Sequence, residues 1–343
     1  MMECQYAKYK LVFKQPSRTS REVLTTKDVY FIRLHDKKSG KTSVGECAVF
    51  PGLSIDYRDN YESKLIQTCH ELEAGENSNL DKWPSIKFGV EGALAGLKAN
   101  VSEWHAGNFP ITINGLVWMG SANEMIERLE SKIALGFQCI KLKIGGIDFY
   151  SELKILKLIR NKLGKELEIR LDANGAFTPE NALRQLEVLS QFNIHSIEQP
   201  IKQGQWQIMA ELCRLSPIKI ALDEELIALC DDEAKIQMLD IIKPAYIILK
   251  PTLCGGLTGS DRWIELASQR NIGWWATSAL ESNIGLNTIA NWVSRYHPTM
   301  PQGLGTGELY TNNIPSPLRL NGERLSYDPC GVWDFQQIEW RNI

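Results

Sequence analysis

The chain has 343 residues, 43% of them hydrophobic, with 38 basic against 41 acidic side chains and a net charge of −3. This balance, and the lack of any basic run, gives no indication of a nucleic-acid partner. No apolar run approaches the roughly 18 to 20 residues of a membrane-spanning helix, so we expect no membrane partner either.

Eight cysteines are scattered singly, and none forms a Cys-x-x-Cys pair. Scattered cysteines in a chain of this size are typical of reduced thiols. The first ten residues, MMECQYAKYK, lack the apolar core of a signal peptide. We therefore expect a cytoplasmic protein. Its length is that of two ordinary domains, or of one large barrel with a smaller companion domain. The sequence does not indicate the oligomeric state.

The amino-terminal third predicts an α+β unit. The stretches YKLVF and VYFIRLHDKKSGKTSVGECAVF indicate strands of a meander whose turn lies at residues 36–40. Helical patterns follow at residues 61–74 and 83–100. After about residue 308 only short apolar pieces remain, LRLNG and VWDF, and we expect this tail to pack back onto the amino-terminal unit.

From about residue 110 the sequence alternates between β-rich apolar runs and helical patterns. The pattern starting at Thr178 has a good N-cap residue followed by Pro179 at the first helical position. Strand and helix repeating at this spacing predict parallel βα units, and eight strands with seven helices suffice to close a barrel. An open doubly wound sheet is the alternative, but the chain has no G-x-G-x-x-G turn. The runs start near Ile111, Cys139, Leu167, Ile194, Ile218, Ala245, Ile272 and Thr299.

The carboxyl ends of these predicted strands, where parallel barrels carry their chemistry, are charged. A single acidic residue at a strand end is more often a helix cap or an ion-pair partner. Six charged residues together are harder to explain in that way, because charges inside a barrel must be compensated. They are Lys141 and Lys143, then Asp172, Glu198 and Asp223 on three consecutive strands, and finally Lys250.

Three carboxylates from neighbouring strands predict an oxygen-ligand site for Mg²⁺, with Mn²⁺ as an ion that can substitute for it. The five histidines lack the spacing of a zinc site. Mg²⁺ would make the α-proton of a bound small-molecule carboxylate more acidic. We predict Lys143 as the general base, Lys141 as the residue that tunes it, and Lys250 on the opposite side of the substrate.

This constellation resembles that of the enolase superfamily, and within it the muconate-lactonizing-enzyme subgroup. The resemblance covers essentially the whole chain. It implies an α/β fold with an α+β capping domain over residues 1–105, joined by the tail over about 308–343. It also implies a modified TIM barrel, (β/α)7β, over residues 106–307. A lysine base acting together with Mg²⁺ belongs to the known chemistry of the superfamily.

Two later stretches, SALESNIG from Ser278 and GLGTGELY from Gly303, resemble the o-succinylbenzoate synthase family. That resemblance implies dehydration of 2-succinyl-6-hydroxy-2,4-cyclohexadiene-1-carboxylate to 2-succinylbenzoate in menaquinone biosynthesis. Lys143 would remove the α-proton and then protonate the leaving hydroxyl, while Lys250 would stabilise the enediolate. The resemblance also gives four candidates for substrate contact: Asn174, Ser278, Gly305 and Thr306.

Other readings of the same residues stay open. An N-succinylamino-acid racemase or a cycloisomerase of the subgroup would share the lysines and carboxylates. The dipeptide epimerases carry Asp-x-Asp on the last strand, which GTGEL lacks. A non-catalytic barrel predicts lost site residues, yet all six are present. Finally, residues 15–27 and residues 48–57 correspond to loops that close the barrel mouth in the superfamily. Arg18 and Arg21 of the first loop are candidates for contact with the succinyl carboxylate, with solvated surface side chains as the alternative.

Overall fold

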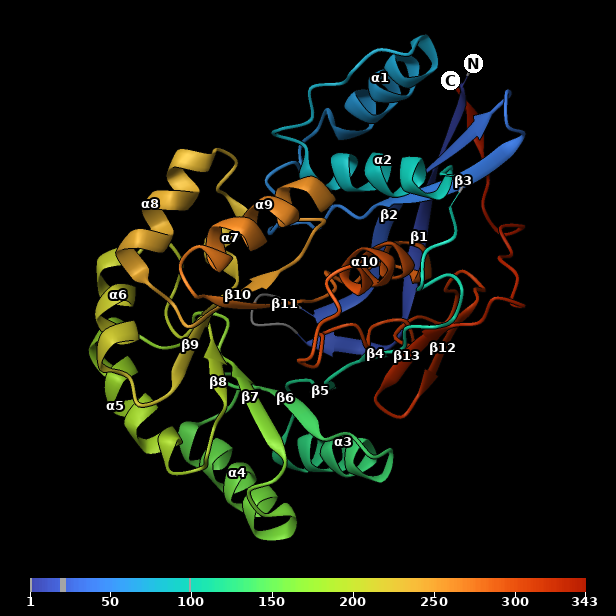
Figure 1. Cartoon of the computed structure of the whole chain (residues 1–343). Helices are drawn as coiled ribbons and strands as arrows, with labels where there is room; N and C mark the ends of the chain where they lie inside the picture. The colour runs from blue at the N-terminus through green and yellow to red at the C-terminus, as the bar shows by residue number, and fades with distance from the viewer. Residues whose placement is uncertain (1, 19–22, 99) are drawn as a thin grey trace.

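The computed structural model describes residues 2–18, 23–98 and 100–343. Its centre is a sheet of seven parallel strands in the order β11-β10-β9-β8-β7-β6-β5, each strand paired with its neighbour in the sequence. This uninterrupted order is that of a barrel wall (Figure 1). The strands are β5 (Gly115–Val117), β6 (Cys139–Lys143), β7 (Glu168–Asp172), β8 (Ser196–Glu198), β9 (Lys219–Leu222), β10 (Tyr246–Leu249) and β11 (Gly273–Ala276).

Helices connect these strands as the alternation predicted. Seven of them have ten or more residues, and α7 adds one short turn directly after β9. The helix α5 begins at Pro179 with Thr178 as its N-cap, as expected. The helices are α3 (Ala122–Ala134), α4 (Phe149–Leu163), α5 (Pro179–Ser190), α6 (Trp206–Leu215), α7 (Glu224–Ile227), α8 (Asp232–Ile242), α9 (Gly256–Ser268) and α10 (Asn283–Ser294).

The predicted eighth strand is replaced by two isolated bridges. Gln302 pairs in parallel with Ile113, and Gly303 pairs in parallel with Thr277, so this short segment joins the two ends of the seven-stranded sheet. The expectation of a regular strand starting near Thr299 was therefore wrong. Prolines at positions 298 and 301 have no amide hydrogen to donate, which limits regular ladder pairing in this segment.

The first predicted run also differs, because it divides into two elements. β4 (Ile111–Thr112) pairs antiparallel with β13 (Arg324–Tyr327), whereas only β5 joins the parallel sheet. β13 forms a hairpin with β12 (Leu318–Asn321). Part of the tail thus packs against the barrel as well as against the amino-terminal unit. The domain boundaries near residues 105 and 308 remain predictions.

The amino-terminal unit, here called the cap, is the predicted meander with two helices. Its sheet has the order β14-β1-β2-β3, all antiparallel, and the last strand of the chain thereby lies beside the first (Figure 1). The helical predictions are confirmed. The elements are β1 (Met2–Arg18), β2 (Val23–Asp36), β3 (Lys41–Cys47), α1 (Tyr61–Ala74), α2 (Pro84–Gly96) and β14 (Arg341–Asn342).

A shared apolar cluster joins the cap, the barrel and the tail. Phe31 of β2, Ile284 of α10 and Ile338 of the tail are all buried in it. Leu280 and Phe50 belong to the same cluster and also line the cavity described below. Burial of apolar side chains contributes about 1.5 to 3 kcal/mol each, so this cluster holds the cap over the barrel.

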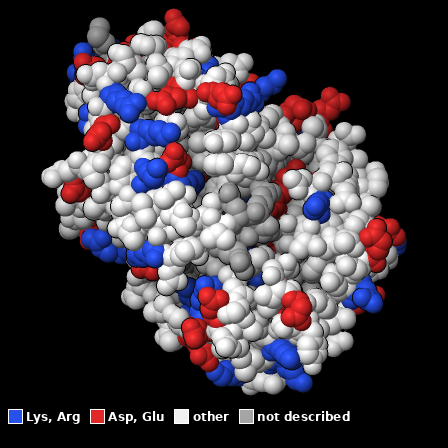
Figure 2. All heavy atoms as spheres, turned by 180° about the vertical axis from the view of Figure 1, so that it is seen from behind, with Lys and Arg blue, Asp and Glu red and all other residues white. Residues whose placement is uncertain are grey.

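The surface agrees with the charge balance of the sequence. Figure 2 shows acidic and basic side chains interspersed over the displayed face. Among the described residues, none of the helices is both long enough and apolar enough to cross a bilayer. The expected contact of Arg21 lies outside the described residues, as does the side chain of Arg18.

Helix α2 rests directly on β3 because glycines face each other there. A Cβ atom on Gly45 would lie 1.9 Å from the backbone oxygen of Gly89, and a Cβ on Gly89 would lie 2.3 Å from the Cys47 sulfur. Neither distance is sterically allowed. The close packing of α2 on β3 therefore requires glycine at both positions.

We predict that Gly45→Ala lowers the free energy of unfolding by about 3 kcal/mol, because backbone atoms cannot yield as a side chain can. Urea unfolding measures the change. Gly136→Ala is the control: that site has a positive φ of 83° but open space around it, so the loss should be only about 1 kcal/mol. Equal losses in the two variants would contradict a steric clash at the α2–β3 crossing.

Candidate active site

Strand register brings the charged residues to one level of the barrel. Lys143 is opposite Asp172 in the β6–β7 ladder, and Asp172 is opposite Glu198 in the β7–β8 ladder. Neighbouring strands lie about 4.8 Å apart, so these side chains are in direct reach of one another. Asp223 directly follows β9, and Lys250 directly follows β10, on the same edge of the sheet.

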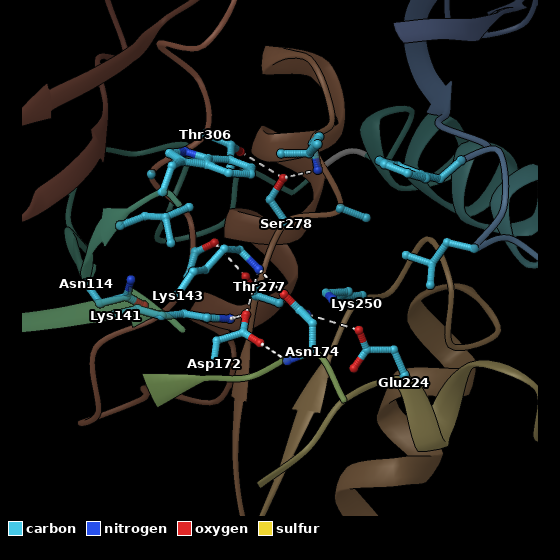
Figure 3. A pocket seen from close by; sticks show the side chains of 18 residues that line it. Asn114, Lys141, Lys143, Asp172, Asn174, Glu224, Lys250, Thr277, Ser278 and Thr306 are labelled. Atoms are coloured by element: carbon cyan, nitrogen blue, oxygen red, sulfur yellow. Dashed lines mark hydrogen bonds and ion pairs between the residues drawn. The ribbon is translucent and has the colours of Figure 1, made fainter. Parts of the chain in front are cut away.

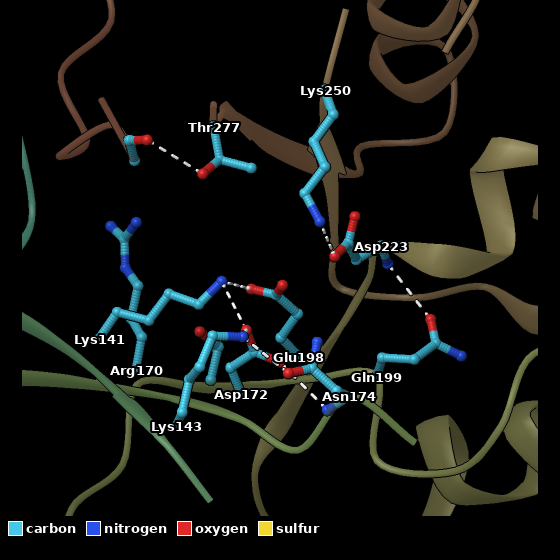
Figure 4. A network of polar contacts seen from close by, with 12 residues as sticks. Lys141, Lys143, Arg170, Asp172, Asn174, Glu198, Gln199, Asp223, Lys250 and Thr277 are labelled. Carbon is cyan, nitrogen blue, oxygen red and sulfur yellow. Dashed lines mark hydrogen bonds and ion pairs between the residues drawn. The ribbon is translucent and has the colours of Figure 1, made fainter. Parts of the chain in front are cut away.

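Lys141 lies at the centre of the resulting ion-pair network (Figure 4). Its Nζ atom is 2.5 Å from Glu198 Oε2 and 2.9 Å from Asp172 Oδ2. The Lys141 side chain is only 9% exposed. One buried ammonium group therefore compensates two buried carboxylates.

The other two lysines each pair with a carboxylate from the adjacent strand of the sheet. Lys143 Nζ donates to Asp172 Oδ2 at 2.8 Å and to Asn174 Oδ1 at 2.7 Å. Lys250 donates to Asp223 Oδ2. Three strands, β7 to β9, separate the strand of Lys143 from that of Lys250. A molecule bound between them would be approached by a lysine from two directions.

Burial and charge set the protonation of this network. Burial alone would lower the pKa of Lys141, but Asp172 and Glu198 outweigh it and raise that pKa. Burial likewise opposes ionisation of Asp172, yet Lys141 and Lys143 hold its pKa well below the usual range. Glu198 differs, because burial and the charge of Asp172 together raise its pKa. Glu198 is thus the member of the network whose ionisation its surroundings oppose.

A divalent cation fits this arrangement. Glu198 Oε1 is buried and has no hydrogen-bond partner among the described residues. A hard cation bound by carboxylate oxygens would satisfy that atom and offset the repulsion among Asp172, Glu198 and Asp223. In the described parts of the chain no cluster of three His, Cys, Asp or Glu side chains is arranged as a ready metal site. Lysine ammonium groups pair with oxygens of all three carboxylates instead.

The site opens into a cavity of about 130 Å³ (Figure 3). Eight of the ten predicted site residues line it. The other two, Glu198 and Asp223, do not line it, but each pairs with a lysine that does. The eight are Lys141, Lys143, Asp172, Asn174, Lys250, Ser278, Gly305 and Thr306.

Several lining residues were not predicted. Glu224 was the easiest to infer, since it follows Asp223 directly; its Oε1 accepts from Asn174 at 3.1 Å, and its buried Oε2 lacks a partner among the described residues. Asn114 and Trp118 come from the strand that was predicted as a single run. Phe50 and Leu53 belong to the expected closing segment 48–57, which does reach the cavity.

Left-handed backbone conformations follow two of the carboxylates. Asn174 has a φ of 44° and Gln199 a φ of 42°. The Gln199 side chain compensates locally, because its amide donates to Glu225 at 3.1 Å while its oxygen accepts the Asp223 amide at 3.3 Å. The ends of β8 and β9 are therefore held together by a side-chain bridge. The sequence alone gave no signal for it.

The turn after Lys143 is held by a buried carboxylate. Glu152 of α4 is 2% exposed, and its Oε1 accepts the Gly145 amide at 2.6 Å. The amides of Gly145, Gly146 and Ile147 favour the ionised form of this carboxyl group and lower its pKa. Burial nevertheless raises the pKa of Glu152 to about 7. This carboxyl group fixes the loop that leaves β6.

Comparison with known proteins agrees with this geometry. Residues 124–304 match the family model described as Enolase C-terminal domain-like. Residues 1–97 match the model described as MenC, N-terminal domain. The chain belongs to the enolase superfamily. Its barrel and cap are thus those of the superfamily fold, as the resemblance implied.

Individual superfamily members are also similar over their whole length. An o-succinylbenzoate synthase from Desulfotalea psychrophila is 46% identical, with 94% of this chain and 98% of that protein covered. The crystal structure of MenC from Desulfotalea psychrophila has a TM-score of 0.83 at 42% identity, covering 95% and 99%. The o-succinylbenzoate synthase from Thermosynechococcus elongatus, complexed with Mg in its active site, has a TM-score of 0.73 at 24% identity, covering 90% and 94%.

We predict a pH-dependent effect of Glu152→Gln on stability. The folded-state pKa of about 7 lies above the ordinary 4.5, so the stabilisation from the protonated group is complete below pH 4.5 and is lost as pH rises through 7. The variant cannot ionise. Relative to the wild type, it should therefore gain up to about 3 kcal/mol between pH 4.5 and pH 8 in urea unfolding. A difference that stays constant with pH would argue against a buried, titrating Glu152.

Proposed function

We propose that the protein is an o-succinylbenzoate synthase, which dehydrates 2-succinyl-6-hydroxy-2,4-cyclohexadiene-1-carboxylate to 2-succinylbenzoate in menaquinone biosynthesis. The observation that carries the proposal is the full-length identity of 46% to such an enzyme, together with the three lysines that line one cavity. The enzyme is a carbon–oxygen lyase whose partner is a small-molecule carboxylate.

Asp172, Glu198 and Asp223 would hold Mg²⁺, or Mn²⁺ as a substitute. Two observations support this assignment: one Glu198 oxygen lacks a partner among the described residues, and burial together with the charge of Asp172 opposes ionisation of Glu198. When bound, the ion supplies positive charge that makes a proton next to a substrate carboxylate more acidic. Lys141, already paired with two of the three carboxylates, holds them in place and influences the neighbouring Lys143 electrostatically.

Lys143 is the proposed general base. It takes the proton from the ring carbon that carries the carboxylate, and the electron pair of that C–H bond moves toward the carboxylate. The same ammonium group then gives its proton to the departing hydroxyl, so that water leaves and the ring becomes aromatic. Lys250, from across the barrel, stabilises the intermediate negative charge with its cation.

The remaining cavity residues would bind the substrate. Asn174 shares a hydrogen bond with the base, and Ser278 and Thr306 are joined by a bond of 2.8 Å at the opposite wall (Figure 3). Gly305 lies beside them. We further propose a cytoplasmic location, supported by eight cysteines that are all free thiols.

Lys143→Ala tests the lyase and its base together. We predict that turnover of the diene, followed by loss of its ultraviolet absorbance, falls by about 10³-fold, because general base catalysis is lost. Excess EDTA should abolish the wild-type reaction, and added Mg²⁺ should restore it. Lys157→Ala, at an exposed position of α4, should leave turnover unchanged. A folded wild-type protein with no activity in Mg²⁺ would refute the proposal.

Lys250→Arg separates this reaction from that of the runner-up, a racemase or cycloisomerase of the same superfamily. Both lysines of a racemase must exchange protons, whereas arginine remains charged and cannot act as a base. We predict that Lys250→Arg keeps more dehydration activity than Lys250→Met. If the wild type racemised N-succinylamino acids with exchange of solvent deuterium, and dehydrated the diene more slowly, the racemase would be the better description.

A further inference from the structure

Two buried charges of the cap reach into one loop of the barrel. Lys27 of β2 is 4% exposed and Glu46 of β3 is fully buried. Among the described residues, their hydrogen-bond partners lie within residues 278–285, the loop that leaves β11 and begins α10. The proposed function gives these two residues no role. Charges are kept in such positions only where their partners are well arranged.

Lys27 holds the carbonyl side of this loop. Its Nζ atom donates to the oxygens of Ala279 at 2.7 Å and of Leu280 at 2.9 Å. The Tyr310 hydroxyl donates to the same Leu280 oxygen at 2.7 Å. Leu280 has a φ of 63°, a left-handed conformation that costs about 1 kcal/mol or more for a residue with a side chain. These hydrogen bonds offset that cost.

Glu46 holds the amide side of the loop. It accepts the backbone amides of Ser282 at 2.9 Å and of Gly285 at 2.8 Å, and also the Ser282 hydroxyl. Ser282 is the N-cap residue of α10, so this carboxylate lies at the positive end of the helix. Lys27 thus binds the first part of the loop and Glu46 binds its last part. We call this pair of residues the cap clamp.

The residues that Lys27 contacts, and the residue just before them, face the proposed substrate. Ser278, Ala279 and Leu280 all line the cavity. Inside the loop, Glu281 accepts the Ala279 amide at 2.7 Å and the Ser278 hydroxyl. Ser278 in turn accepts from Thr306 at 2.8 Å. A shift at the clamp would therefore move the hydroxyl pair at the cavity wall, while the lysines and carboxylates of β6 to β10 would stay in place.

We propose that Lys27 and Glu46 are positioning residues that set substrate affinity by fixing residues 278–280 from the cap. The effect on turnover rests on the proposed function, whereas the effect on the loop does not. The clamp touches neither the proposed base nor the proposed metal ligands. Its loss should therefore raise KM and leave kcat and Mg²⁺ affinity nearly unchanged.

The test uses Lys27→Met, Glu46→Gln and the double variant. The double variant removes both charges, so that it leaves no single buried charge behind. We expect KM to rise at least tenfold in each with kcat within about threefold of the wild type, and Lys27→Arg to recover part of the loss. The Mg²⁺-dependent thermal shift should not change. In the substrate-free protein, amide hydrogen exchange should accelerate in residues 277–287 but not in β6 and β7.

Glu91→Gln is the matched control. Glu91 is also a cap carboxylate bound to barrel amides, but it accepts from Leu257 and Thr258 at the start of α9, away from residues 278–285. Its KM and its exchange in residues 277–287 should equal those of the wild type. The proposal is overturned if the clamp variants keep wild-type exchange in that loop, or if Glu91→Gln raises KM as much as they do. If exchange accelerates in the clamp variants as expected but the wild type is inactive on the diene, only the proposed function is refuted.

Discussion

Several carboxylates share one buried space at the carboxyl ends of β6 to β10, and the barrel is arranged around their need for positive charge. An ionised carboxylate taken out of water costs several kcal/mol unless partners compensate it. Here the ladder register places Asp172 between Lys143 and Glu198, and Lys141 spans two carboxylates from one pleat below. Even so, one oxygen of Glu198 stays without a partner among the described residues. The proposed divalent cation would satisfy that oxygen.

Much of this arrangement could be read from the sequence. The alternation of strand and helix predicts the barrel, since buried parallel strands need apolar runs and crossover helices need one apolar face. Charges at strand ends stand out against those apolar runs, so Lys141, Asp172 and Glu198 were visible without a structure. The form of the closure at Gln302 was not, because the run near Thr299 predicts a regular strand, whereas two isolated bridges form directly after Pro301.

Features that depend on contacts between distant segments could not be predicted from the sequence. Lys27 lies 252 positions from Ala279, whose carbonyl it holds, and no local sequence pattern predicts such a contact. Glu152 resembled any acidic residue in the first turn of a helix until the fold buried it against the loop after Lys143. The Lys27 ammonium group and the Glu152 carboxyl group are both bound by backbone atoms. Since every residue type has the same backbone groups, such partners cannot be recognised from the sequence.

The pairing of β14 with β1 bears on how the protein is made. Ribosomes release the chain from its amino terminus, so β1 to β3 can pair with each other early. The outer edge of β1 receives its partner Arg341 only with the last residues, and the buried Ile338 arrives at the same time. During most of synthesis the nascent cap therefore exposes an unpaired strand edge and an uncovered apolar face. Such surfaces are those that chaperones bind and that promote aggregation. The domain that is synthesised first is the last to be completed.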